Sequence, residues 1–215
     1  MSSDPQPLLT RLVFVRHGES VGNATQTIHG HRVCGGLSET GREQCARLAE
    51  RLVRTGELSG ATLYATHFRR ARETAQVIAP ALGDPAVLVD ERFGEIDWGA
   101  DCDGLTWAEV VERHGTPDWD ADPEISFFPG GESVAALRRR VVVAIDAAVE
   151  AHQGQLVVVC THGGAIDVAV RHAMGVVGRN GFDLYTTNTS LTGITDTGRA
   201  RWRIDRYNDA AHLLG

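Results

Sequence analysis

The sequence predicts an α/β fold, a three-layer α/β/α sandwich around a mainly parallel, mixed central sheet. Short apolar segments with the length of buried strands alternate along the chain with longer segments whose apolar residues repeat at helical spacing. This alternation is typical of a sheet covered by helices on both faces. With 215 residues, 42% of them hydrophobic and 23% charged, the chain has the size and composition of one globular unit with one core.

We expect residues 1–9 to be a flexible N-terminal tail and residues 10–215 to be a single domain, because no repeat or low-complexity linker divides them. The apolar run QLVVVCT is the clearest buried strand. In chain order, the strands are expected over 11–15, 61–66, 86–90, 155–161, 191–197 and 200–207.

The first long helix is expected to begin after Ser38, which suits the N-cap position, and to end near Gly56. The next helix is expected from about Arg70, with a kink at Pro80 in its last turn. The apolar stripe of the first helix consists of Cys45, Leu48, Ala49, Leu52 and Val53.

Residues 91–131 are acidic and punctuated by Gly and Pro, and we expect an irregular insertion over the active site, with one short helix at about 107–114. A long helix should follow Ser133, and a last one should follow the strand at 155–161. Aromatic residues of the insertion could form a lid, although we favour a small core of its own; they are Trp98, Trp107, Trp119, Phe127 and Phe128.

The net charge of −7 argues against a nucleic-acid or anionic-membrane surface, since such surfaces are usually basic. No signal peptide and no segment of membrane-spanning length stands out, so we expect a cytoplasmic protein with no membrane partner. No CxxC pair occurs, and we expect reduced thiols at Cys34, Cys45, Cys102 and Cys160.

Polar residues follow four of the expected strands. Arg16 and His17 end the first strand, Arg69 and Arg70 follow the second, Glu95 lies beyond the third and His162 ends the fourth. If these strands are parallel neighbours, their carboxyl ends bring two histidines, at least two arginines and one carboxylate into one crevice. Each alone is more often an ordinary loop or surface residue, but together two guanidinium groups, two imidazoles and a helix N-terminus suit a phosphoryl group.

At this point the chain resembles the histidine phosphatase superfamily, also called phosphoglycerate-mutase-like. A lone RHG is a weak signal, but an ordered set of motifs over most of the chain is highly specific. The matching segments are VRHGES with Asn23 after it, LSETGREQ, RRARETA, ERFGEIDWG, PGGES, VVVCTHGG and NTSLT.

The resemblance implies a role for each matching residue. His17 would be the nucleophile that becomes a phosphohistidine, and Glu95 would protonate the leaving oxygen and then activate water. The phosphate oxygens would be held by Arg16, Arg70 and His162, with help from Asn23 and the Gly163 N–H. No metal and no cofactor is expected, because the cationic side chains would stabilise the transition state.

The physical chemistry of the residues agrees with these roles. An imidazole attacks phosphorus only when one ring nitrogen is unprotonated, and a cationic surround disfavours the imidazolium form. The other nitrogen of His17 needs an acceptor, such as a backbone carbonyl near Gly18. Glu95 must start protonated, which burial against Phe93 or Trp98 would favour.

Two segments depart from the family pattern, HGHRVCGGLS at 29–38 and GADCDGL at 99–105. Both flank the pocket in the family, so they bear on substrate selection, and we expect His29, His31 and Arg32 to contribute to it. His29, His31 and Cys34 could also bind zinc, but solvated or substrate-facing histidines are the favoured interpretation in this Gly-rich loop.

We therefore predict a metal-independent phosphomonoesterase that acts on a small phosphorylated metabolite. A phosphoglycerate mutase or other phosphoryl mutase is the first alternative, but GEIDWG is more similar to the phosphatase branch. A non-catalytic phospholigand-binding protein is the second, although His17 and Glu95 are both present. A Rossmann nucleotide binder is disfavoured because no GxGxxG follows the first strand. A homodimer is compatible with the sequence, which leaves the oligomeric state open.

Overall fold

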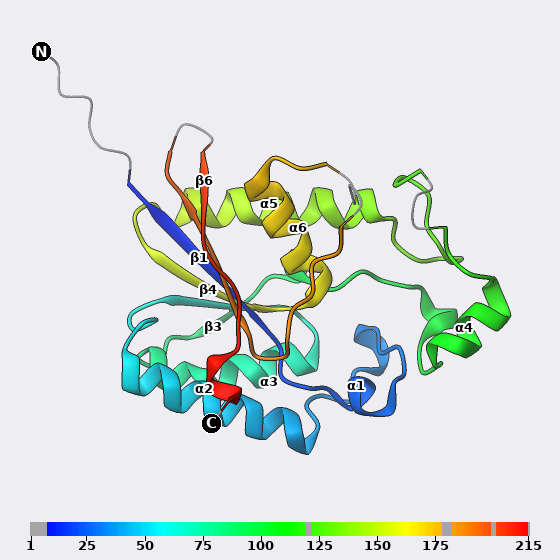
Figure 1. The fold of residues 1–215 in the computed structure, drawn as a ribbon, viewed down its shortest axis with the longest axis horizontal. Coiled ribbons are helices and arrows are strands. Elements are labelled where there is room, and N and C mark those ends of the chain that lie inside the picture. The colour runs from blue at the N-terminus through cyan, green and yellow to red at the C-terminus, as the bar shows by residue number, and fades with distance from the viewer. Residues whose placement is uncertain (1–7, 119–121, 178–181, 199–200, 215) are drawn as a thin grey trace, which may run out of the picture.

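The structure, a computed structural model, describes residues 8–118, 122–177, 182–198 and 201–214. Its centre is a six-stranded sheet in the order β3-β2-β4-β1-β5-β6 (Figure 1). The four strands from β3 to β1 are parallel, and β5 and β6 run antiparallel to their neighbours. The predicted mainly parallel, mixed sheet is confirmed.

All six expected strands form, with ends that differ by at most two residues from the expected ones. Their bounds are β1 Thr10–Arg16, β2 Thr62–Ala65, β3 Val87–Val89, β4 Leu156–Thr161, β5 Leu191–Asp196 and β6 Trp202–Asp209. Part of the turn between β5 and β6 lies outside the described residues.

Helices cover both faces of the sheet. Figure 1 places α2 (Glu39–Thr55) and α3 (Arg69–Ile78) on one face, and α5 (Val134–Ala151) and α6 (Gly163–Met174) on the other. Strand β1 supplies both cores because successive side chains of a strand point to opposite faces. Leu12 and Phe14 pack in the core under α5 and α6, whereas the alternate residues of β1 pack in the core under α2 and α3.

The ends of the helices follow from local sequence. Ser38 caps α2 by accepting from Gly41 N, and Gly56 ends the helix in a left-handed conformation. The expected kink at Pro80 within the helix is wrong: α3 ends at Ile78, and the chain continues as a short 3₁₀ segment, Ala79–Leu82. The expectation for Val53 is wrong: its side chain is 70% exposed, because it is rotated by about 100° from its buried neighbour Leu52.

Two helices lie beyond the carboxyl edge of the sheet, α1 (Val21–Thr25) and α4 (Trp107–His114) (Figure 1). The five-residue α1 was not expected, whereas α4 has the expected bounds. Around α4, a small core contains Cys102, Val110 and Phe128, with Trp98 and Phe127 packed against it. This agrees with the small-core interpretation of the aromatic residues; Trp119 lies outside the described residues.

Of the expected N-terminal tail, residues 1–7 also lie outside the described residues, and Leu8 and Leu9 are exposed. That the rest of the chain is a single domain stays a prediction. Among the helices of the described part of the chain, none combines the length and the apolar character needed to cross a membrane.

Candidate active site

The carboxyl ends of β1 and β4 meet at the centre of the sheet. The His17 N–H donates to Thr161 O at 2.9 Å, so the residues after the two strands are held side by side. On its other side, β1 pairs with β5. The loop before β5 contributes Asn188, whose Nδ2 donates to His17 O at 2.8 Å. The backbone of His17 is therefore fixed from both sides, in the crevice that the sequence predicts.

The ring of His17 is buried and held in one orientation. Its Nδ1 lies 2.6 Å from Gly18 O, and its Nε2 lies 3.1 Å from Arg70 Nε. Because a carbonyl only accepts and a guanidinium only donates, Nδ1 carries the proton and Nε2 carries the lone pair. Burial, and next the charge of Arg70, holds the pKa of His17 well below its usual value. The expected acceptor near Gly18 is the Gly18 carbonyl itself.

His162 is the second buried imidazole of the site. Its ring centroid lies 5.1 Å from that of His17, and its Nε2 lies 2.9 Å from Thr66 Oγ1. Burial, followed by the charge of Arg70, also lowers the pKa of His162 well below its usual value. Its Nδ1 is buried and has no hydrogen-bond partner among the described residues, which leaves one ring nitrogen available to a ligand.

The three arginines in RRARETA have different surroundings. Arg70 is only 6% exposed, whereas Arg69 and Arg72 are exposed. Besides its contact with His17, Arg70 donates through NH1 to His29 O at 2.9 Å and lies 4.5 Å above the ring of Phe68. The first position of helix α3 therefore faces solvent, and the second faces the site.

Arg16 reaches the site from the end of β1. Its NH1 donates to Thr186 O, and its Nε is buried with no partner in the described part of the chain. Burial lowers the pKa of Arg16, while the nearby Glu95 carboxylate opposes that shift. A partly buried guanidinium with an unused buried donor is suited to an anionic ligand.

Glu95 approaches the same crevice from the loop after β3. Its Oε2 accepts from Gly164 N at 3.2 Å and its Oε1 from Ile96 N at 3.0 Å. A Cβ at Gly164 would lie 2.2 Å from Oε1, so glycine at this position allows the carboxylate to reach the start of α6. The backbone carbonyl of Glu95 accepts from Arg140 NH2 at 2.9 Å, which fixes the loop that carries Glu95 to α5.

Of the predicted phosphate-binding residues, Gly163 has more support from the geometry than Asn23. Gly163 begins helix α6 after the N-cap His162, so its N–H is one of those free at a helix start. The Asn23 Oδ1 instead accepts from Ser20 N at 3.1 Å and Ser20 Oγ at 3.0 Å, which caps α1. Its role in the site stays a prediction.

Sequence reasoning missed Thr74, which lies behind the end of β1. Its Oγ1 accepts from Gly18 N at 3.1 Å and donates to Arg70 O at 2.8 Å. One hydroxyl thus ties the glycine that orients His17 to the helix that carries Arg70. A Thr four residues after a buried Arg on a helix is the signal that could have identified it.

The two segments that depart from the family pattern bond to each other. The Asp103 carboxylate accepts from Gly30 N and from Arg32 Nε, both at 2.8 Å. Arg32 also forms a two-bond ion pair with Asp97. The guanidinium of this predicted substrate-selecting residue is therefore occupied by two carboxylates.

His29 and His31, the two histidines of this loop, have different neighbours. His29 Nε2 lies 3.1 Å from Thr27 Oγ1, whereas the His31 ring lies 5.1 Å from that of His67. Cys34 Sγ lies 3.5 Å from Arg70 NH1. Nowhere in the described residues do three His, Cys, Asp or Glu side chains form a group that could hold a metal, so the geometry does not support the zinc alternative.

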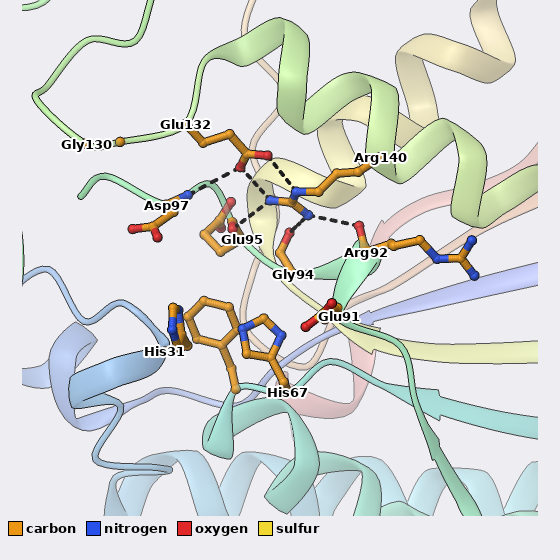
Figure 2. A pocket seen from close by; sticks show the side chains of 12 residues that line it. His31, His67, Glu91, Arg92, Gly94, Glu95, Asp97, Gly130, Glu132 and Arg140 are labelled. Atoms are coloured by element: carbon orange, nitrogen blue, oxygen red, sulfur yellow. Dashed lines mark hydrogen bonds and ion pairs between the residues drawn. The ribbon is translucent and has the colours of Figure 1, made fainter. Parts of the chain in front are cut away.

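A pocket of about 560 Å³ opens beside Glu95 (Figure 2). It lies between the loop that follows β3, the start of α3 and the segment before α5. Its lining includes His31, His67, Phe68, Glu91, Glu95 and Arg140. Of the three residues predicted to select substrate, only His31 lines this pocket. Two of its lining residues contact the group around His162: Glu95 accepts from Gly164 N, and the Phe68 ring lies 4.6 Å from the His162 ring.

Known proteins resemble this chain over almost its full length. The model of the histidine phosphatase superfamily (branch 1) matches residues 12–210. Two relatives from Arabidopsis thaliana are a phosphoglycerate mutase-like protein 4, 32% identical over 94% of this chain and 86% of the relative, and a metal-independent phosphoserine phosphatase, 30% identical over 95% and 84%. A mycobacterial glucosyl-3-phosphoglycerate phosphatase structure has a TM-score of 0.79 and 28% identity over 94% of this chain and 99% of its own.

These matches span the residues that form the crevice, from His17 at the end of β1 to the loop that carries Asn188. The sheet, its helices and the order of the motifs agree with the resemblance found in the sequence. The chain belongs to branch 1 of the histidine phosphatase superfamily and is a phosphoric monoester hydrolase.

Proposed function

We propose that the chain is a metal-independent phosphomonoesterase that cleaves small phosphorylated metabolites through a phosphohistidine on His17. The observation that carries the proposal is the orientation of His17. With Nδ1–H on Gly18 O and the lone pair of Nε2 directed at Arg70, the ring has the tautomer that attack on phosphorus requires. Its lowered pKa keeps the ring unprotonated at neutral pH.

In the first step, Nε2 attacks phosphorus, so a P–N bond forms and the P–O bond to the alcohol breaks. The leaving oxygen takes the proton of Glu95. The phosphorylated ring keeps its Nδ1–H and is cationic, and the Gly18 carbonyl stabilises that charge. Arg16, Arg70 and His162 surround the equatorial oxygens and stabilise the transition state.

In the second step, Glu95 accepts a proton from water as the water attacks phosphorus and the P–N bond breaks. The products are inorganic phosphate, free His17 and protonated Glu95, so the cycle closes without any other reactant. Glu95 is suited to both steps because it lies at the junction of the crevice and the pocket.

Trapping the phosphoenzyme tests this proposal. The protein is mixed with p-nitrophenyl phosphate in the presence of EDTA, quenched within one turnover at alkaline pH and digested for mass spectrometry. We expect one phosphoryl group on the peptide that contains His17. We expect it to be absent in His17→Asn and to accumulate in Glu95→Gln, because nitrophenolate leaves without a proton but hydrolysis still needs a base.

The matched control is His152→Asn, at the C-terminal end of α5, where the ring contacts Tyr64. This variant should be labelled like the wild type. Label on a different residue, or activity that persists in His17→Asn, would refute the mechanism. Transfer of the phosphoryl group to 3-phosphoglycerate, faster than to water, would instead support the mutase alternative.

A further inference from the structure

The pocket beside Glu95 has an unusual balance of charge. Two arginines and four carboxylates line it, and both arginines already have acidic partners. We propose that this pocket selects phosphomonoesters whose alcohol carries hydrogen-bond donors, as hydroxyl or ammonium groups, and no second anionic group. The selection would depend chiefly on Glu91. This inference rests on the proposed function, because the pocket receives the leaving group only if His17 receives the phosphate.

Arg140 cannot bind a second anion. A guanidinium has five N–H donors, and Arg140 uses all five within the protein. Nε and NH2 donate to the Glu132 carboxylate, NH1 donates to the carbonyls of Arg92 and Gly94, and NH2 also donates to Glu95 O (Figure 2). Its role is to fix the loop that carries Glu95 onto α5.

Arg92 is also occupied. Its Nε and NH2 donate to the Asp90 carboxylate, with the shortest contact at 2.6 Å. Figure 2 shows its guanidinium turned away from His31 and Glu95. The nearby Arg32, which does not line the pocket, is held by Asp97 and Asp103. Arg92 keeps N–H donors that Asp90 does not take, but both pocket arginines are paired with a carboxylate, which weakens their attraction for a substrate carboxylate or second phosphate.

Two of the four pocket carboxylates, Glu91 and Glu95, form no ion pair within the described residues, and Glu95 accepts from the backbone N–H groups of Ile96 and Gly164. That leaves Glu91, whose side chain is exposed. It lies near enough to His67 to oppose the lowering of the pKa of that ring. Figure 2 shows its side chain on the His67 side of the pocket. An unpaired carboxylate attracts O–H and N–H donors and repels anions.

A row of rings lines the pocket on the same side as Glu91. The rings of His31 and His67 lie 5.1 Å apart, and that of Phe68 lies 4.7 Å from His67. The pKa of His67 is lowered, first by burial and then by the charge of His31, so this ring does not supply a cation at neutral pH. Flat ring faces with carboxylates beside and above them suit a compact alcohol with hydroxyl or ammonium groups.

Two pairs of esters test the inference, because the members of each pair differ in one carboxylate. They are glycerol 3-phosphate with 3-phosphoglycerate, and O-phosphoethanolamine with O-phosphoserine. Dissociation constants are measured by calorimetry on His17→Asn, which binds without turnover, and kcat/KM is measured on the wild type. We expect about tenfold tighter binding and higher kcat/KM for the member without the carboxylate. The preference should shrink as salt is raised.

Glu91→Gln keeps the size and hydrogen bonding of the side chain and removes its charge. It should reduce both preferences by about threefold or more, mainly by improving the carboxylate-bearing esters. Glu112→Gln, on an exposed face of α4, is the matched control and should keep the wild-type preference. A difference between the two pairs would distinguish hydroxyl from ammonium recognition.

The inference and the proposed function can fail separately. Equal or tighter binding of the carboxylate-bearing esters, or no effect of Glu91→Gln on the preference, would overturn the inference even if His17 is phosphorylated. Conversely, a binding preference measured on His17→Asn would uphold the inference for this pocket even if the wild type forms no phosphohistidine, in which case the proposed function alone is lost.

Discussion

Arg70 Nε donates to His17 Nε2 across 3.1 Å. The lone pair that we propose as the nucleophile therefore points at the guanidinium that we propose as a phosphate ligand. Substrate phosphate would enter between the two groups. We expect Arg70→Lys to lower kcat/KM by about 10²–10³, because an ammonium cannot replace the two-pronged contact with phosphate oxygens.

The neighbouring residue provides the matched control. Arg69 is exposed and pairs with Glu73 at 2.6 Å one helical turn on, so Arg69→Lys should leave kcat/KM within about twofold. Steady-state kinetics with p-nitrophenyl phosphate compares the two variants. Equal losses would show that general helix destabilisation, not the position of Arg70, causes the effect.

The pH dependence of phosphoryl transfer should reflect the buried state of His17. Because its pKa is held well below the usual value, the ring stays unprotonated as the pH falls through about 6.5. The rate of phosphoenzyme formation at saturating substrate should therefore show no acid limb near pH 6.5. Rapid quench at several pH values measures it, and Arg70→Met should shift the acid limb to higher pH. An acid limb near 6.5 in the wild type would contradict the assignment.

Thr74 should act as a positioning residue. Its hydroxyl joins Gly18 N to Arg70 O, so Thr74→Val leaves the buried Gly18 N–H without an acceptor and frees the carbonyl that orients His17. We expect kcat to fall about tenfold or more with little change in KM, and Thr74→Ser to restore most of it. A loss in Thr74→Ser as large as in Thr74→Val would assign the effect to packing of the methyl group.

Local sequence was sufficient to predict most of the fold. The apolar runs at β1 and β4 are buried on both sides, and Ser38 and Gly56 bound a helix through capping chemistry that can be read from neighbouring residues. The five-residue α1 was missed because it has too few residues for a periodic pattern, and its cap depends on Ser20 meeting Asn23. Val53 was misassigned because sequence alone does not give the width of the contact face.

The placement of the candidate site residues was predictable where motifs mark strand ends, as at His17, Arg70 and His162. The supporting contacts of the site were not, since they join distant segments. Nothing in the local sequence indicates that Asp103 binds Gly30 and Arg32 across more than 70 positions. The same holds for Arg140, whose five donors end on residues some 8 to 48 positions away.

Gly41 should be intolerant of any side chain. Its ideal Cβ would lie 1.9 Å from Glu19 O, and the obstructing atom is backbone next to Gly18. We expect Gly41→Ala to lower the free energy of unfolding by about 2–3 kcal/mol. Gly163→Ala is the control for stability, since its Cβ would meet only Thr186 Oγ1 at 3.6 Å. Urea unfolding measures both, and equal stability of the two variants would refute the close contact.

The two buried imidazoles should make the fold sensitive to acid. The pKa values of His17 and His162 are lowered in the folded state, so below about pH 6.5 the unfolded chain binds protons that the folded chain does not. Stability is thus fully present above that pH and falls as the pH drops towards the folded-state pKa values. Between pH 7.5 and 5.5, each ring should cost about 1.4 kcal/mol.

Urea unfolding of wild type, His17→Gln, His162→Gln and the double variant at these two pH values isolates this contribution. The double variant should lose roughly 3 kcal/mol less than the wild type over the interval, and each single variant about half of that. Other histidines and the carboxylates titrate in all four proteins and cancel in the comparison. Parallel losses in all four proteins would mean that the two rings are protonated in the folded state, and the nucleophile assigned to His17 would then lack its lone pair at acid pH.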